Sequence, residues 1–152
     1  MTEDLSYFLE TIKYTGKLDP RKLVENKIPI DKKIKDSVLK INQTNWVWTL
    51  WSCQGHNRGA NKGCLPYYVF VVKKKYLPVL LEKIYNTSPK IATHEFPCHN
   101  GSYSYQLAPG YEDENFSVVS LHYHSSHGNL SLNRIQQSMN ELSVSICEEN
   151  YG

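Results

Sequence analysis

The chain has 152 residues, of which 40% are hydrophobic and 21% charged, and its formal net charge is +2. This composition is typical of one globular domain with a hydrophobic core and excludes an intrinsically disordered chain. No stretch approaches the roughly 20 apolar residues that span a bilayer, and the first residues are acidic rather than those of a secretory leader, so we expect a cytoplasmic protein without a membrane partner.

Charge is distributed unevenly along the chain. Residues 1–90 carry 16 Lys and Arg against 8 Asp and Glu, whereas residues 91–152 carry 1 against 7. If the two halves occupy different surfaces, the basic one could attract phosphate-bearing ligands; a solvated helical face is the alternative. The four cysteines are irregularly spaced, which favours reduced thiols over a disulfide framework: Cys53, Cys64, Cys98 and Cys147.

The first 42 residues carry helical patterns. Apolar residues recur at helical spacing from Leu5 to Tyr14, and Asp19 followed by Pro20 is typical of a short helix's first turn. A third helix is predicted from about Ile30 to Ile41, where apolar residues repeat every three or four positions.

The remaining residues predict strands and two further helices. Trp46–Trp51 and Tyr67–Val72 are apolar runs of strand length, and a helix follows at Leu77–Ile84. Weaker strands are expected in three segments: Lys90–Phe96, Ser102–Leu107 and Phe116–His124. A closing helix from Leu132 to Ile146 has Asn129 or Ser131 as its cap.

This order of elements predicts one α+β domain over residues 1–152. Its N-terminal part, 1–42, would be helical, and 43–152 would form a mostly antiparallel sheet and two helices. We expect the helices to pack on one face of the sheet.

The centre of interest is the turn Ser52-Cys53-Gln54-Gly55-His56, which follows a buried strand. Gly55 permits backbone angles that a Cβ would forbid, so the side chains of Ser52, Cys53 and His56 could converge. Arg58 and Lys62 follow in a glycine-rich loop that could turn N–H groups and positive charges toward an anion. A surface hairpin with solubilising charges is the alternative.

Three tryptophans precede this turn. By strand alternation, Trp46 and Trp48 should share a face and Trp51 should lie on the other. One of them could stack on a base beside the turn, although a tryptophan in the core is the more frequent outcome.

The segment 36–86 resembles known proteins. A helix, a strand, the Ser52–His56 turn, a second strand and a helix are similar to small Ser-Cys-x-Gly-His proteins of phages and bacteria. The segment is more distantly similar to the wybutosine-synthesis tRNA methyltransferase family. Ser52, Cys53 and Gly55 match that family's Ser-Ser-Cys-Ser-Gly-Arg turn, with Trp51 in place of its first Ser and His56 in place of its Arg. The resemblance implies S-adenosylmethionine as an alternative cofactor.

Histidines and cysteines offer a possible zinc site. Their spacings, Cys-x-x-His and His-x-His-x-x-His, can chelate zinc. The candidate ligands are Cys53, His56, His122, His124 and His127. Hydrogen-bonded or exposed histidines are the alternative, and we expect no metal. For acid–base or nucleophilic chemistry, His122 or His124 would be a better partner for Cys53 than the adjacent His56.

Three function classes follow from these residues. The leading hypothesis is a protein that binds a nucleotide or another phosphorylated small molecule through the turn, the basic loop and an aromatic side chain. The resemblance implies a phage setting, in which the protein sequesters a nucleotide immune signal. The second hypothesis is an enzyme acting on RNA or nucleotides, by methyl transfer or hydrolysis, using Cys53, His56 and the cluster from His122 to His127. The third is a protein-interaction module with exposed tyrosines at Tyr103, Tyr105 and Tyr111. An oligomer is compatible with each.

Overall fold

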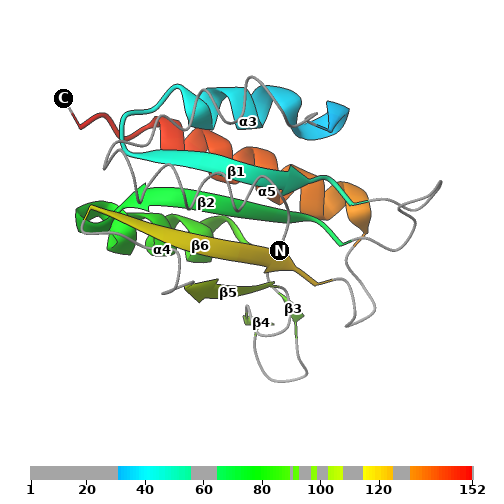
Figure 1. Cartoon of the computed structure of the whole chain (residues 1–152). Coiled ribbons are helices and arrows are strands. Elements are labelled where there is room, and N and C mark those ends of the chain that lie inside the picture. Colours follow the sequence, from blue (N-terminus) through cyan, green and yellow to red (C-terminus); the bar gives the residue numbers. More distant parts are fainter. Residues whose placement is uncertain are drawn as a thin grey trace.

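The computed structural model describes seven parts of the chain (Figure 1). These are residues 31–55, 65–89, 91–92, 97–98, 103–107, 115–124 and 131–151. The two helices expected within residues 5–14 and near residue 19 lie outside the described residues, and so does most of the predicted helical N-terminal part.

The long elements lie where the hydrophobic patterns predict them. A 3₁₀ turn, Lys32–Ile34, leads into α3, Lys35–Asn42. The other helices are α4, Leu77–Thr87, which follows a 3₁₀ turn at Lys74–Tyr76, and α5, Leu132–Cys147. The strands of the main sheet are β1, Val47–Cys53, β2, Tyr67–Lys73, β5, Tyr103–Leu107, and β6, Phe116–Tyr123.

The main sheet has the strand order β1-β2-β6-β5, and every neighbouring pair is antiparallel. β2 is therefore an inner strand, as its uninterrupted apolar run predicts. A separate two-stranded ladder joins β3, Ile91–Ala92, to β4, Pro97–Cys98. The sequence predicts one longer strand over 90–96 and none at Pro97, because proline is rare inside strands and is a poor marker of a two-residue ladder.

The three α-helices of the described residues cover one face of the main sheet, with α5 between α3 and α4 (Figure 1). Alternation on β2 explains this layer. Tyr68, Phe70 and Val72 are fully buried in a core shared with helical residues such as Ile41, Leu80 and Met139. The prediction of an α+β fold with a mostly antiparallel sheet and helices on one face is confirmed.

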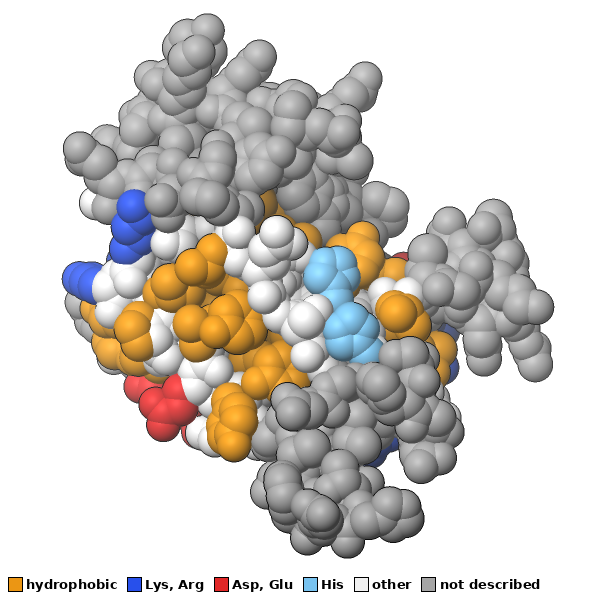
Figure 2. All heavy atoms as spheres, turned by 90° about the horizontal axis from the view of Figure 1, so that it is seen from below, with side chains coloured by type: hydrophobic (Ala, Val, Ile, Leu, Met, Phe, Trp, Pro, Cys, Tyr) orange, Lys and Arg blue, Asp and Glu red, His pale blue; other side chains and the backbone are white. Residues whose placement is uncertain are grey.

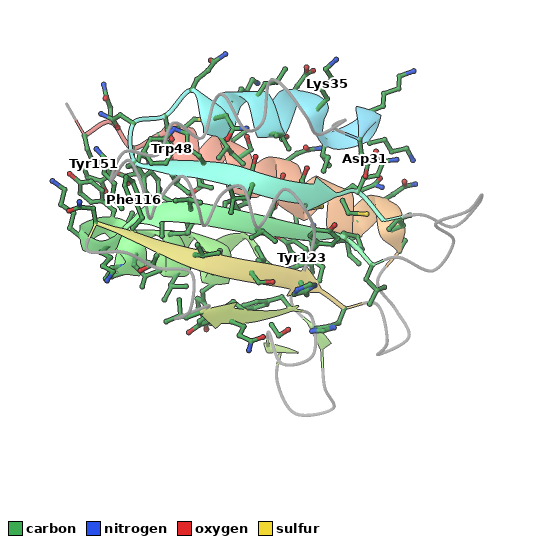
Figure 3. All side chains as sticks on the ribbon, in the orientation of Figure 1. Asp31, Lys35, Trp48, Phe116, Tyr123 and Tyr151 are labelled. Atoms are coloured by element: carbon green, nitrogen blue, oxygen red, sulfur yellow. The ribbon has the colours of Figure 1, made fainter. Side chains whose placement is uncertain are left out.

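β1 contains a bulge, and two of the tryptophans near it are not arranged as predicted. Leu50 has no partner on β2, because Thr49 pairs with Phe70 and Trp51 with Val69. Trp46 precedes the strand and lies in the helix-side core, whereas Trp48 packs edge-on against Phe116 (Figure 3). The prediction that Trp46 and Trp48 share a face is therefore wrong, since simple alternation starts only within the strand.

Polar side chains form hydrogen bonds at the ends of two helices. Ser131 caps α5, since its hydroxyl accepts a hydrogen bond from the Arg134 N–H at 3.1 Å. Ser131 is one of the two residues that the sequence predicts as the cap. At the end of α3, the buried Asn42 joins the helix to β1. Its Oδ1 accepts from the Thr49 N–H at 2.7 Å, and its Nδ2 donates to the Thr49 hydroxyl at 2.9 Å.

Replacing Asn42 tests this link. Asn42→Ala leaves the buried Thr49 N–H without its acceptor, so we expect the free energy of unfolding to fall by about 1–3 kcal/mol. Urea denaturation measures the change. Gln43→Ala, at the exposed neighbouring position, is the control and should change stability by less than about 0.5 kcal/mol. Equal losses in the two variants would contradict a specific role for Asn42.

Candidate functional site

Hydrogen bonds of Gln54 link the turn after β1 to α5 and to the 3₁₀ turn before α3. Its N–H donates to Asp31 Oδ2 at 3.0 Å, while its side-chain Oε1 accepts from the Lys33 N–H at 2.8 Å. These two hydrogen bonds run in opposite directions between the two segments. The Gln54 side chain satisfies an N–H at the start of the 3₁₀ turn before α3, as capping side chains do. The Gln54 carbonyl also accepts from Gln136 Nε2 of α5 at 2.8 Å. The turn is thus part of the framework that joins α3, β1 and α5.

Gly55 adds a steric reason for this turn. Its φ is +82°, in the left-handed region that favours glycine. A Cβ at this position would lie 2.5 Å from Leu132 Cδ1 and 2.8 Å from Pro66 Cγ. The backbone of Gly55 therefore packs closely against the first residue of α5.

Gly55→Ala should lower stability, because the new methyl group meets both the unfavourable φ and its two close neighbours. We expect a loss of at least about 2 kcal/mol in the free energy of unfolding. Ser52→Ala, in the same turn but in β1, should cost less than about 1 kcal/mol. Chemical denaturation of both variants makes the comparison, and an unchanged Gly55→Ala variant would show that the backbone relaxes freely.

The side chains of Ser52 and Cys53 lie on opposite faces of the sheet. Ser52 pairs with Tyr68, whose side chain lies in the helix-side core, and Cys53 pairs with Tyr67 on the opposite face. The Cys53 side chain is only 7% exposed, and its sulfur accepts a hydrogen bond from the Gly55 N–H at 3.4 Å. The convergence of these two side chains, which the sequence suggests, is therefore not found.

A row of residues crosses the sheet at this end. The register aligns Cys53 with Tyr67, Tyr67 with His122, and His122 with Ser104. Two strand spacings of about 4.8 Å put the Cα atoms of Cys53 and His122 about 10 Å apart. Tyr67 lies between them in the register, and the centroids of the Tyr67 and His122 rings are 5.6 Å apart. The described structure thus separates the proposed Cys–His pair by one aromatic side chain.

His122 and His124 form a polar cluster with two serines on this face. His122 Nε2 is 2.7 Å from the Ser120 hydroxyl, and His124 Nε2 is 2.9 Å from the Ser104 hydroxyl. Figure 2 shows the two histidine rings side by side on the surface. Partial burial, and then the nearby charge of His124, lower the pKa of His122 below its ordinary value of 6.5. His122 therefore carries a proton less often at neutral pH than an ordinary histidine does.

The lowered pKa of His122 makes stability depend on pH. As the pH falls below 6.5, the unfolded chain binds a proton at His122 before the folded chain does, so the free energy of unfolding decreases. The decrease ends once the pH is below the folded-state pKa. We expect His122→Asn to reduce this decrease between pH 7 and pH 5, as measured by urea denaturation. Identical pH profiles for the two proteins would contradict the shift.

Several predicted site residues lie outside the described part of the chain. These are His56, Arg58, Lys62 and His127, and the Trp51 side chain is not described either. Gly55 and Leu65, which bound the stretch with the basic residues, lie at the same end of the sheet as His122, because Cys53 and Tyr67 pair there.

The described donors do not converge on a metal. Among the described residues, no group of three or more His, Cys, Asp or Glu could hold a metal ion. His122 and His124 are engaged by separate serines, and Cys53 lies two strands from His122. The predicted zinc site stays a prediction, because two of its candidate ligands, His56 and His127, lie outside the described residues.

Sequence analysis did not identify most of the residues that contact the histidines and the turn. Tyr67 appears in the sequence only as the first residue of an apolar strand, and Gln54 only as the variable position of the turn. Strand alternation does predict Ser120 beside His122, because it precedes His122 by two residues and therefore shares its face, and the structure confirms this. Ser104 and Gln136 come from distant segments, and only the strand register and helix packing reveal them.

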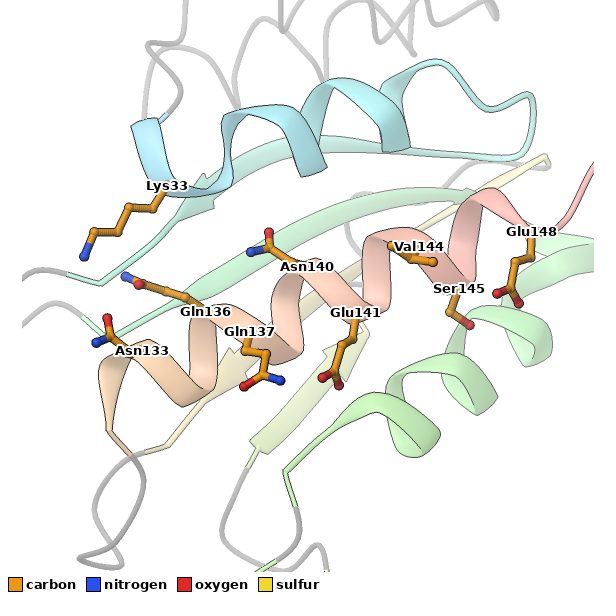
Figure 4. A pocket seen from close by; sticks show the side chains of 9 residues that line it. All are labelled: Lys33, Asn133, Gln136, Gln137, Asn140, Glu141, Val144, Ser145 and Glu148. Atoms are coloured by element: carbon orange, nitrogen blue, oxygen red, sulfur yellow. The ribbon is translucent and has the colours of Figure 1, made fainter.

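The structure also contains a groove on the helical layer, far from the histidine face (Figure 4). Its volume is about 660 Å³, and it runs along the outer side of α5. The lining is mainly amides and carboxylates, including Gln137, Asn140, Glu141 and Glu148. It lacks the aromatic and apolar walls that typical small-molecule sites have.

Comparison with protein-family models, with curated proteins and with solved structures found no match. In the part of the chain that the structure describes, no helix is long and apolar enough to cross a membrane. The arrangement of His122, His124 and their neighbours is therefore the basis for the proposed function.

Proposed function

We propose that this protein binds a nucleotide, or a closely related phosphorylated small molecule, on the sheet face around Tyr67, His122 and His124. The observation that carries the proposal is the row in which the Tyr67 and His122 rings lie 5.6 Å apart beside the hydroxyls of Ser104 and Ser120. Aromatic rings and hydroxyl groups on a sheet face are the groups that hold bases in many single-strand-binding proteins.

The chemistry of the cluster favours a base over a bare phosphate. A neutral imidazole offers one donor and one acceptor and a flat ring, which suit a base edge or a stacked base. Both histidines are held in place by serine hydroxyls, so their rings need little ordering when a ligand arrives. The proposed ligand therefore stacks on Tyr67 or His122 and hydrogen-bonds to His124.

The phosphate would be held by the basic loop. Arg58 and Lys62 belong to the stretch between Gly55 and Leu65, and both ends of that stretch lie at the end of the sheet where Tyr67 and His122 pair. In this proposal the cations neutralise the phosphate while the sheet face holds the base. Ser52, Cys53 and Gly55 then support the site from within the framework.

The resemblance to phage and bacterial Ser-Cys-x-Gly-His proteins suggests the setting. We propose a cytoplasmic phage protein that removes a nucleotide signal of antiviral defence by binding it. A short RNA with an unstacked base would offer the same chemistry. S-adenosylmethionine, an alternative supported by the resemblance alone, contains an adenine that could stack in the same way.

Titration with nucleotides tests the proposal. We expect mononucleotides or cyclic dinucleotides to raise the melting temperature of the wild-type protein. Tyr67→Leu should weaken the best of these interactions about tenfold or more, because it removes a stacking surface. Tyr85→Leu is the matched control, since Tyr85 is 55% exposed on α4 in the helical layer, and it should leave affinity unchanged. Isothermal calorimetry gives both affinities.

The same experiment separates the function classes. Recovery of the nucleotide intact by mass spectrometry supports binding, whereas a hydrolysed or methylated product would favour the enzyme instead. The absence of a shift with every nucleotide, or equal losses in Tyr67→Leu and Tyr85→Leu, would overturn the proposal. Circular dichroism of each variant shows that it is folded.

A further inference from the structure

Strand β5 forms an exposed edge of the main sheet. It pairs with β6 on one side, and no strand in the described part of the chain pairs with its other side. Such an edge presents a row of backbone donors and acceptors to any strand of compatible sequence. Natural edge strands are commonly protected by charged residues or proline, and Tyr103–Leu107 contains neither.

The side of β5 that faces the helical layer is apolar yet open to solvent. Tyr105 pairs with Leu121 and Leu107 with Val119, and both β6 partners are fully buried in the core. The β5 residues themselves are 47% and 44% exposed. Apolar side chains of β5 are thus exposed along this edge, and Figure 2 shows hydrophobic side chains gathered there beside the histidines.

We propose that β5 pairs with β5 of a second copy of this chain, in a two-fold symmetric dimer with one continuous sheet. The sequence Tyr-Ser-Tyr-Gln-Leu suits antiparallel pairing with itself about Tyr105. In that register Tyr103 faces Leu107 of the partner subunit, which is an aromatic–aliphatic pair, and Ser104 faces its Gln106, which is a polar pair. Because the strand is uncharged, no like charges meet across the axis.

This arrangement selects a second copy over other occupants. A basic or acidic peptide would find no counter-charge along β5, whereas a neutral strand with the same alternation finds apolar groups on one face and polar groups on the other. The second copy supplies that alternation, and the pairing covers the exposed Tyr105 and Leu107 side chains of both copies. The dimer would also extend the row of Tyr67, His122 and Ser104 by Gln106 of the partner subunit.

Sedimentation analysis of the full chain over a wide concentration range tests the dimer. The wild-type protein should reach the dimer mass as concentration rises. Tyr105→Lys places two like charges opposite each other on the axis, and should raise the dissociation constant about tenfold or more. Val144→Lys is the matched control, since Val144 is an apolar residue 57% exposed on α5, and it should leave the dimer intact.

Cross-linking provides a second measurement in case Tyr105→Lys does not fold. In a Cys147→Ser background, Tyr105→Cys should form a disulfide-linked dimer under mild oxidation, because residue 105 faces its own copy on the axis. Val144→Cys should do so far more slowly. A monomer at every concentration, a dimer that Tyr105→Lys leaves unchanged, or equal cross-linking at residues 105 and 144 would overturn the proposal. None of these results depends on nucleotide binding.

Discussion

The pairing of β2 on both of its edges is the constraint on which the rest of the structure depends. β2 bonds to β1 on one side and to β6 on the other, and alternate residues of it are fully buried against the helices. Each pairing therefore decides which side chains of the neighbouring strand enter the core. A slip of one residue would exchange the two faces of that strand and would expose its apolar side chains.

The two motifs that stand out in the sequence, the turn after β1 and the histidines of β6, have different roles in the structure. The turn that attracts attention in the sequence is bound through Gln54 to α3 and α5, so it holds the framework together. The residues that remain open to a ligand, His122 and His124, come from a strand that lies next to β2 but far away in sequence. We therefore interpret the turn as the support of the proposed site and the histidine face as its contact surface.

Local patterns predicted the long elements well. The spacing of apolar residues located α3, α4 and α5, and the apolar runs located β1 and β2, because burial of one face produces these periods directly. The shared face of Trp46 and Trp48 was predicted wrongly, since Trp46 precedes the first residue of β1 and alternation does not extend to it. The neighbours of His122 on other strands, Tyr67 and Ser104, could not be predicted, because they depend on which strands pair and in which register. Predicted residues such as Arg58 and Lys62 lie outside the described residues and stay predictions.

The bulge at Leu50 also has a consequence for how this chain can change in evolution. β1 uses seven residues, Val47–Cys53, against six paired positions of β2, from Val72 back to Tyr67. Loss of Leu50 would leave all six pairs intact, so a shorter relative could keep the same sheet and the same turn. Loss of a paired residue further along would instead shift Cys53 away from Tyr67 and move Gly55 away from Leu132. Leu50 and the paired residues of β1 therefore differ in their tolerance to deletion.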